Sequence, residues 1–354
     1  MNKNFKIAIG YHIQDGPWGG GNQFAKTLSE YLRNQSVEVC FDLEADDIDI
    51  ILLTEPRRGV ISGSFNDYDI EQYLKVNEGA LVVHRINDCD ERKRTHFYNR
   101  RLIWANRVAD QTVYVGSWMV DLFEKQGLPS RKPKSVIHSG GDRNIFFPKK
   151  ADKLTRKKLR VITHHWSGDY YKGWDIYKAF DEMLDQDEWN NLFEFVYVGK
   201  LNDDIVLHNT ECHPPMSGSE LADMIRSCDV YLTASLYEPS GNHHIEGALC
   251  GLPVIYRNSG ALPEYCKGYG IEFSDLDTFQ KALSRIRSEH QHYLDALKGY
   301  PWDSVRMTTA FYELFCSMID NRATYIKNRS VYKQDDYLFT KCGQLGFSEE
   351  RLFP

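Results

Sequence analysis

The sequence lacks the patterns that define several common classes of protein. No apolar run approaches the ~18 residues needed to cross a bilayer, and the first residues carry no cleavage signature of a secreted protein. None of the eight cysteines forms a C-x-x-C pair, so neither a zinc site nor a disulfide framework is indicated. The formal net charge of -7 disfavours binding to nucleic acid. These absences predict a cytoplasmic protein that is soluble or peripherally associated with a membrane.

The length and the hydrophobic patterning predict two domains. A chain of 354 residues exceeds the usual size of a single hydrophobic core. Both halves alternate short β-branched runs, "DIVLHN" among them, with helical patterns, which is typical of parallel sheets covered by helices. A Pro- and Lys-rich stretch interrupts this alternation near residues 147–158, where we place a linker. We therefore predict an α/β fold with two Rossmann-like, doubly wound domains at 1–148 and 149–320, and a tail at 321–354 that packs along the surface.

Glycines stand at the end of the first predicted strand. In open parallel sheets ligands bind beyond the carboxyl ends of the strands. There the stretch "GPWGGGNQF" places Gly19, Gly20 and Gly21 before a helix, where backbone N–H groups can approach an anion. The spacing is not G-x-G-x-x-G, and Asp42, after the second strand, is a weak candidate for binding a ribose. A plain tight turn is the alternative interpretation.

Two further strand ends carry charged residues. Lys172 and Gly173 stand at a strand-to-helix junction in "YYKGWDIY", where a lysine can neutralise a diphosphate or simply be solvated. The stretch "SLYEPSGNHHIEGALCGLPVI" places Glu238 in a turn and Glu246 on the following helix. Carboxylates accept hydrogen bonds, so the first suits sugar hydroxyls and the second a ribose diol. The alternative is one glutamate favoured by the helix dipole and one surface glutamate.

Several of these stretches, taken in order, resemble retaining glycosyltransferase family 4, whose members have the GT-B fold. "E-P-S-G-N-H-H-I-E" resembles its E-x7-E region, "GGGNQFAKTLSEYL" its glycine-rich loop and first helix, and "YYKGWDIY" its Lys-Gly motif. "YVGSWMVDLFEKQGLPSRKPKSVIHSGGDRNIFFP" is similar to the end of its first domain. The similarity covers roughly residues 5–320 and implies two Rossmann-like domains that face an interdomain cleft. It also implies that the acceptor approaches from the first domain and that the second domain holds most of the nucleotide sugar.

The resemblance implies a hexosyltransferase that retains the anomeric configuration. Its donor is a nucleoside-diphosphate sugar such as GDP-mannose or UDP-glucose, its acceptor is a glycan or a lipid-linked sugar, and it needs no cofactor and no catalytic metal. Carried over residue by residue, the resemblance implies catalytic roles for Glu238, Lys172 and His84, and places an acid of uncertain role at Glu264. We expect His84 at the end of the strand "GALVVH". The implied donor-binding residues are Gly19, Gly20, Gly21, Ser167, Lys172, Glu238, Ser240, Gly241, Asn242, His243 and Glu246.

One position departs from the pattern of the family. Relatives commonly have an arginine five residues before the lysine of the Lys-Gly motif, and this chain has Ser167 there. A hydroxyl donates a hydrogen bond but brings no charge. Neutralisation of the phosphate charge then depends more on Lys172. Candidate substitutes for the arginine are Arg85, Arg257 and His165.

Basic residues also gather around a predicted helix of the first domain, namely Arg92, Lys93, Arg94, Arg100, Arg101 and Arg107. Such a face can meet an anionic acceptor or a membrane surface, and the alternative is a solvated helix face.

Two other functions stay open, a sugar-nucleotide epimerase of the same fold and a catalytically weak module that binds nucleotide sugars. The sequence does not fix the oligomeric state.

Overall fold

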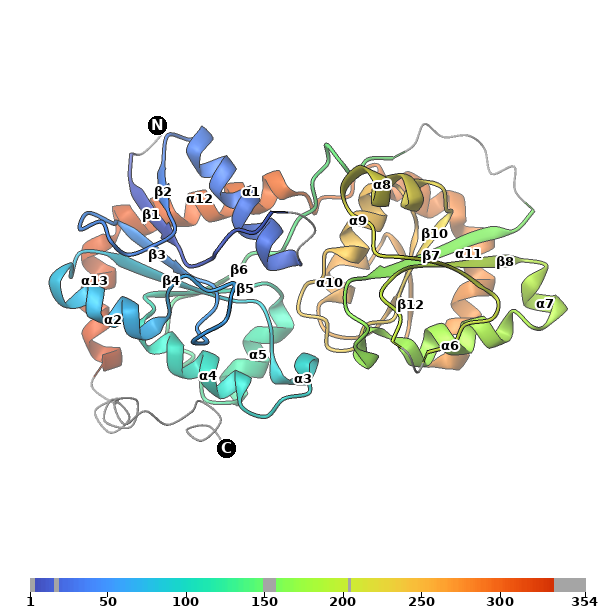
Figure 1. Cartoon of the computed structure of the whole chain (residues 1–354), viewed down its shortest axis with the longest axis horizontal. Helices are drawn as coiled ribbons and strands as arrows, with labels where there is room; N and C mark the ends of the chain where they lie inside the picture. The colour runs from blue at the N-terminus through green and yellow to red at the C-terminus, as the bar shows by residue number, and fades with distance from the viewer. Residues whose placement is uncertain (1–3, 16–18, 149–156, 203–204, 334–354) are drawn as a thin grey trace. The chain divides into compact units, whose positions relative to one another are not determined.

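The computed structural model describes residues 4–15, 19–148, 157–202 and 205–333. These residues form two compact α/β units (Figure 1). Unit 1 contains the chain up to His138 and again from Met307 onward, whereas unit 2 contains Ser139–Arg306. Each unit has a six-stranded sheet whose strands all pair in parallel. This arrangement confirms the predicted fold class of two Rossmann-like domains.

The sheet of unit 1 has the strand order β2-β1-β3-β4-β5-β6. Its strands are β1 (Lys6–Ile9), β2 (Glu38–Cys40), β3 (Ile50–Leu53), β4 (Leu81–Ile86), β5 (Gln111–Tyr114) and β6 (Lys134–Val136). The helices of its first stretch of chain are α1 (Gly20–Asn34), α2 (Asp67–Val76), α3 (Asp90–Lys93), α4 (Tyr98–Ala105), η1 (Asn106–Val108) and α5 (Ser117–Lys125). Side chains alternate between the faces of the sheet, so Ile7 and Ile9 pack with α1 while Ala8 packs with α2.

The division between the units differs from the boundaries expected from the sequence. The chain returns to unit 1 within α12 (Ser304–Asp320), and α13 (Arg322–Lys333) follows. The reason is that α12 presents an apolar face to the core of unit 1, formed by Met307, Phe311, Phe315 and Met318. In α13, Arg329 forms a buried ion pair with Asp110, with Nε 2.7 Å from Oδ1. The tail beyond residue 333 and part of the expected linker lie outside the described residues.

The sheet of unit 2 has the strand order β12-β11-β10-β7-β8-β9. Its strands are β7 (Leu159–His165), β8 (Phe193–Gly199), β9 (Thr210–His213), β10 (Val230–Thr233), β11 (Val254–Arg257) and β12 (Gly270–Phe273). Its helices are η2 (Tyr170–Lys172), α6 (Trp174–Met183), α7 (Asp187–Asn190), α8 (Gly218–Arg226), α9 (His243–Leu249), α10 (Leu262–Cys266) and α11 (Leu276–Leu297).

The strand predicted over "DIVLHN" is wrong, because β9 begins only at Thr210. The carboxylate of Asp181 on α6 accepts hydrogen bonds from the backbone N–H groups of His208 and Asn209, at 2.8 and 2.9 Å. These bonds hold the segment away from sheet pairing until Thr210, although its residue Ile205 still contributes to the core of unit 2.

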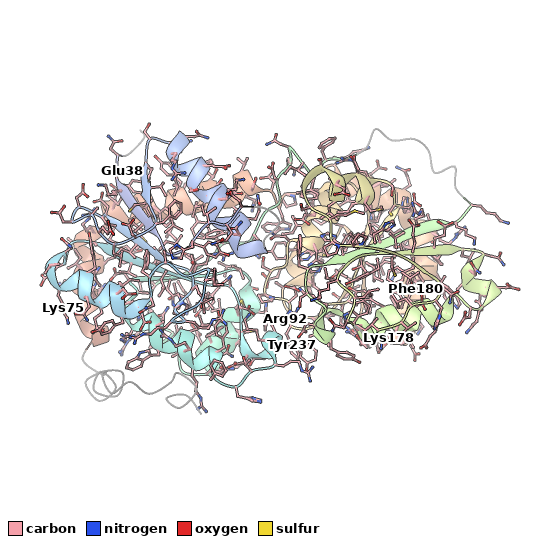
Figure 2. All side chains as sticks on the ribbon, viewed as in Figure 1. Glu38, Lys75, Arg92, Lys178, Phe180 and Tyr237 are labelled. Carbon is pink, nitrogen blue, oxygen red and sulfur yellow. The ribbon has the colours of Figure 1, made fainter. Side chains whose placement is uncertain are left out.

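Aromatic side chains fill the core of unit 2 beneath α6. Phe180 lies 4.8 Å from Phe195 and 5.5 Å from Phe279 between ring centroids, and Figure 2 labels it on α6. Each such buried side chain contributes roughly 1.5–3 kcal/mol of hydrophobic stabilisation. Trp174, the first residue of α6, is fully buried in the same core. This packing fixes the beginning of α6 and with it the loop that carries Lys172.

Among the described residues, no helix combines the length and the hydropathy needed to cross a membrane.

Candidate functional site

Lys172 lies in a loop at the carboxyl end of β7 whose shape is set by its neighbours. The carboxylate of Asp169 accepts a hydrogen bond from Tyr171 N at 2.8 Å and caps η2. Gly173 follows with a φ of +108°, and a Cβ there would lie 2.4 Å from the Cβ of Ala234. Glycine alone meets both demands without strain. Gly173 therefore brings the Lys172 loop against the end of β10.

Further contacts join this loop to the turn that follows β10. Leu236 N donates a hydrogen bond to Tyr171 O at 2.8 Å, and Lys172 Nζ lies 3.1 Å from Glu238 Oε2. The side chains of this ion pair are 15% and 6% exposed, so solvent screens the pair only weakly. An ammonium group has three N–H donors. Lys172 can therefore hold Glu238 and still donate to a phosphate oxygen.

The backbone around Glu238 is fixed by close approaches that require glycine. Gly260 has a φ of +59°, and a Cβ there would lie 2.3 Å from Glu238 O. Ala261 N donates a hydrogen bond to the same carbonyl at 2.8 Å. On the other side, Gly241 has a φ of +38°, and its Cβ would lie 3.0 Å from Glu238 Cδ. A tightly packed turn therefore places the carboxylate of Glu238.

Glu246 lies on α9 and contacts the end of β7. His164 Nε2 is 2.9 Å from Glu246 Oε2, and His164 Nδ1 is 3.0 Å from Tyr231 OH. Because an ionised carboxylate only accepts, Nε2 carries the proton and Nδ1 accepts from the tyrosine hydroxyl. This chain of hydrogen bonds orients Glu246. The sequence pointed to Glu246 but not to His164 and Tyr231, which reach it from β7 and β10.

Residues 240–243 lead from the Glu238 turn into α9. Ser240 Oγ lies 2.8 Å from the hydroxyl of Tyr265 on α10, beside Glu264. His243 Nε2 lies 2.8 Å from Thr233 Oγ1, and burial lowers the pKa of His243 well below its usual value. The ring of His243 is therefore neutral and committed to the interior, so this residue can meet a ligand only through its backbone.

His244, the second residue of α9, is a buried histidine that the sequence analysis did not single out. It is fully buried, and neither of its ring nitrogens has a hydrogen-bond partner among the described residues. Its ring centroid lies 5.0 Å from those of His243 and Tyr265. Burial lowers the pKa of His244 to about 3, so its ring is neutral at pH 7.

Two of the three candidate substitutes for the missing arginine lie in unit 2, and both are engaged elsewhere. Arg257 makes a two-pronged ion pair with Asp175 and donates to the carbonyl of Ala234 at 3.0 Å. His165 is 4% exposed, and its Nε2 lies 2.9 Å from the hydroxyl of Tyr177. Ser167 is exposed, and its hydroxyl accepts a hydrogen bond from Asp169 N at 3.2 Å.

In unit 1 the glycine-rich loop opens onto the start of α1. The helix begins at Gly20 with Gly19 as its N-cap residue, and both are exposed. A Cβ at Gly19 would meet no described atom within 4 Å, whereas one at Gly21 would lie 3.2 Å from the ring of Tyr11. Asp42 follows the edge strand β2, where its carboxylate accepts a hydrogen bond from the backbone two residues on at 3.1 Å.

The structure places His84 inside unit 1 rather than at a strand end. β4 continues to Ile86, and His84 is fully buried with its Nδ1 3.1 Å from Asn106 Nδ2. Burial lowers the pKa of His84 to about 3, so its ring is neutral at pH 7. Side chains alternate along a strand, so Arg85 points to the opposite face.

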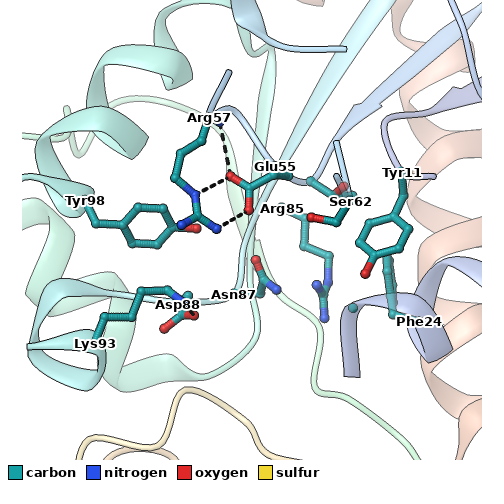
Figure 3. A pocket seen from close by; sticks show the side chains of 12 residues that line it. Tyr11, Phe24, Glu55, Arg57, Ser62, Arg85, Asn87, Asp88, Lys93 and Tyr98 are labelled. Carbon is teal, nitrogen blue, oxygen red and sulfur yellow. Dashed lines mark hydrogen bonds and ion pairs between the residues drawn. The ribbon is translucent and has the colours of Figure 1, made fainter. Parts of the chain in front are cut away.

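A cavity of about 150 Å³ lies at the carboxyl ends of β1, β3 and β4. Arg85 lines it, together with Gly21 of the glycine-rich loop. This volume is roughly that of five water molecules, which is too small to enclose a nucleotide. Figure 3 shows the side chains that line it, which include Tyr11, Glu55, Arg57, Asn87, Lys93 and Tyr98. No sequence pattern indicated that these residues meet.

The basic residues near α4 do not form one solvated face. Arg101 and Arg107 both form ion pairs with the buried carboxylate of Asp67 on α2. Lys93 pairs with Asp88 at 2.7 Å. At least three of the six basic residues therefore take part in ion pairs within unit 1. Two of them pair with Asp67, which is distant from them in the sequence.

Two parallel six-stranded sheets with Rossmann-like topology, each with polar residues at its carboxyl strand ends, define the architecture of the GT-B glycosyltransferases. Within unit 2, residues 168–289 match a family described as glycosyl transferases group 1. This stretch contains Lys172, Glu238 and Glu246. The match covers less than half of the chain, and it supports the assignment of this protein as a glycosyltransferase. A comparison with curated proteins finds no match.

Solved structures share the fold over most of the chain. Sucrose-phosphate synthase from Thermosynechococcus elongatus aligns with a TM-score of 0.64 and 12% identity, covering 90% of this chain and 100% of that chain. HepE of Anabaena in complex with UDP aligns with a TM-score of 0.66 and 14% identity, covering 88% and 100%. The catalytic domain of Starch Synthase IV from Arabidopsis thaliana, bound to ADP and acarbose, aligns with a TM-score of 0.66 and 10% identity, covering 89% and 99%.

Proposed function

We propose that this protein is a retaining glycosyltransferase that transfers a hexose from a nucleoside-diphosphate sugar to a carbohydrate acceptor. The observation that carries the proposal is the pairing of Lys172 with Glu238 at 3.1 Å, in a turn that leads to the Glu246–His164 pair. A cation beside two acids, all at the carboxyl ends of parallel strands, matches the charges and hydroxyl groups of such a donor. The family match over residues 168–289 supports the same class of reaction.

In this proposal unit 2 binds the donor. Lys172 binds the diphosphate, Glu238 accepts hydrogen bonds from hexose hydroxyls, and Glu246 accepts them from the ribose. The backbone of residues 240–243 adds further contacts to the hexose. Solved structures of similar fold have UDP, UDP-glucose and ADP bound, which supports a nucleotide donor. GDP-mannose and UDP-glucose remain the donors that we propose.

The chemistry requires a bond to break at the anomeric carbon while negative charge builds on the leaving diphosphate. Lys172 stabilises that charge, since electrostatic stabilisation of developing charge is often the largest contribution to catalysis. We propose that the acceptor hydroxyl attacks from the face that the diphosphate leaves, and that the diphosphate takes the proton of that hydroxyl. This route retains the configuration, and none of its steps calls for a metal ion.

Product analysis tests the proposal. The protein is incubated with GDP-mannose, UDP-glucose or UDP-N-acetylglucosamine and with a panel of saccharide acceptors, and the products are followed by NMR. The proposal predicts free nucleoside diphosphate and a glycosylated acceptor with the anomeric configuration of the donor. An isomerised donor without acceptor would indicate an epimerase instead, and a donor that binds but is never consumed would indicate a binding module.

A further inference from the structure

Apart from Gly21 and Arg85, which the sequence placed among the candidates for binding the donor, the residues that line the cavity of unit 1 belong to none of the donor contacts expected above. The lining combines three cations with two acids, namely Arg57, Arg85 and Lys93 with Glu55 and Asp88. Tyr11, Ser62, Asn87 and Tyr98 add uncharged hydrogen-bonding groups. The cavity therefore offers both donors and acceptors to a ligand, with one more positive than negative charge among its lining side chains.

At one end of the cavity the acids are matched by cations. Arg57 donates from Nε and Nη2 to the two carboxylate oxygens of Glu55, at 2.8 and 2.6 Å (Figure 3). Lys93 Nζ lies 2.7 Å from Asp88 Oδ2. Ion pairing removes most of the repulsion that these acids would exert on an anionic ligand. Both carboxylates remain able to accept hydrogen bonds from hydroxyl groups, because each has several lone pairs.

Arg85 supplies the third positive charge at the other end, beside Tyr11 and Phe24 (Figure 3). Its guanidinium carbon lies 3.8 Å from the centroid of the Phe24 ring, and the residue is only 5% exposed. Stacking on a ring holds the guanidinium plane in one orientation, with its N–H donors at the edge of that plane. Burial raises the pKa of Tyr11, so its hydroxyl also stays a hydrogen-bond donor at neutral pH.

We propose that this cavity binds the acceptor and that the acceptor saccharide carries an oxyanion, a carboxylate or a phosphate, which Arg85 binds. The inference rests on the proposed transferase function and adds the chemical class of its second substrate. A planar guanidinium matches the two oxygens of a carboxylate or phosphate in a bidentate pair. Glu55 and Asp88 accept hydrogen bonds from the hydroxyl groups of the same sugar, as carboxylates in sugar sites can.

A binding assay with matched probes tests this inference. Methyl glucuronide, glucose 6-phosphate and methyl glucoside differ mainly in the charge of one group, and each is titrated into the full protein with ligand-observed NMR. We expect at least one anionic probe to bind at least ten-fold more tightly than the neutral glucoside, and the carboxylate and phosphate arms identify the source of the oxyanion. We also expect added NaCl to weaken only the binding of the anionic probe.

Variants locate the binding site of the anionic probe. Arg85→Gln should abolish the preference for the anionic probe, and Arg85→Lys should keep part of it because the charge remains. Arg58→Gln is the matched control, since Arg58 is exposed, stacks on Tyr68 at 5.0 Å and does not line the cavity. Thermal unfolding checks that each variant folds. The salt dependence of the wild-type protein tests the charge preference even if Arg85→Gln fails to fold.

Other outcomes would overturn the inference. Equal binding of charged and neutral probes, no binding of any probe, or an unchanged preference in folded Arg85→Gln would each contradict it. A loss of anionic binding in Lys172→Ala would also contradict it, because the oxyanion would then occupy the donor site of unit 2. Separate titrations with UDP and GDP test the transferase proposal on its own. If neither nucleotide binds, that proposal fails, and the probe data still decide whether the cavity binds an oxyanion.

Discussion

Lys172 Nζ lies 3.1 Å from Glu238 Oε2, although 66 positions of the chain separate the two residues. Two glycines make this possible, because Gly173 lets the lysine loop approach β10 and Gly260 lets a second loop support the backbone of Glu238. A cation and an acid that are placed this firmly are ready for a ligand without further ordering. The backbone geometry at the two glycines thus places the two charged groups that we propose to bind the donor.

Replacing the carboxylate of Glu238 tests its role toward the hexose. Glu238→Gln keeps the shape of the side chain but removes the charge that strengthens hydrogen bonds from sugar hydroxyls. We expect kcat/KM for the complete donor to fall by about 10- to 100-fold, which corresponds to about 1.5–3 kcal/mol. The affinity for the nucleoside diphosphate alone should change much less. Equal losses for both ligands would assign Glu238 to the nucleotide instead.

Removing the imidazole that orients Glu246 tests the proposed ribose site. His164→Phe keeps an aromatic side chain but deletes the hydrogen bonds to Glu246 and to Tyr231. We expect about ten-fold weaker binding of nucleoside diphosphates, and unchanged competition by inorganic pyrophosphate, which has no ribose. His213→Phe is the control, because His213 makes a similar 2.7 Å contact with Glu211 on the edge strand β9. A parallel loss of pyrophosphate affinity would contradict the assignment.

A single methyl group at Gly260 should disturb the turn that holds Glu238. Gly260→Ala combines the cost of a left-handed backbone with a collision against Glu238 O. We expect unfolding to be easier by about 2–5 kcal/mol. Gly268→Ala has the same left-handed backbone, at φ +88°, but open space around the new Cβ, and should cost only about 1–2 kcal/mol. Equal losses in urea unfolding of the two variants would show that the close approach is unimportant.

Two buried histidines predict how stability depends on pH. Burial lowers the pKa of His84 and His244 to about 3, whereas an unfolded imidazole titrates near 6.5. Between these values the unfolded state binds more protons, so the free energy of unfolding falls as pH drops from 7 to 5 and is level above about pH 7. Each histidine accounts for at most about 2 kcal/mol of this loss.

The histidine variant that checks this dependence is His244→Leu. Both ring nitrogens of His244 are without described partners, so the change should cost little at pH 7. Urea unfolding at pH 7 and pH 5 should show a smaller loss of stability in the variant than in the wild-type protein. The same loss in both proteins would mean that His244 does not titrate on unfolding in this range.

The sequence predicted the parts of the structure that depend on neighbouring residues. Alternating strands and helices predicted two parallel sheets, and the glycine beside Lys172 indicated a strand-to-helix junction. The return of α12 to unit 1 could not be predicted, because an apolar helix face shows that a helix packs but not on which sheet. The Glu246–His164 contact depends on the order of β7 and β10 in the sheet, which local patterns do not carry. The strand that was expected to end at His84 continues to Ile86. The length of β4 is set by its pairing with β5, which local patterns do not carry.

The central claim is that unit 2 binds a nucleoside-diphosphate sugar through Lys172, and calorimetric titration tests it most directly. GDP-mannose, UDP-glucose and UDP-N-acetylglucosamine are titrated into the wild-type protein, into Lys172→Ala and into Lys178→Ala, a control on the following helix. The account predicts that a donor binds, that Lys172→Ala weakens it by about 1.5–3 kcal/mol, and that Lys178→Ala does not. Absence of binding by all three donors, or equal affinity in the wild-type protein and Lys172→Ala, would contradict it.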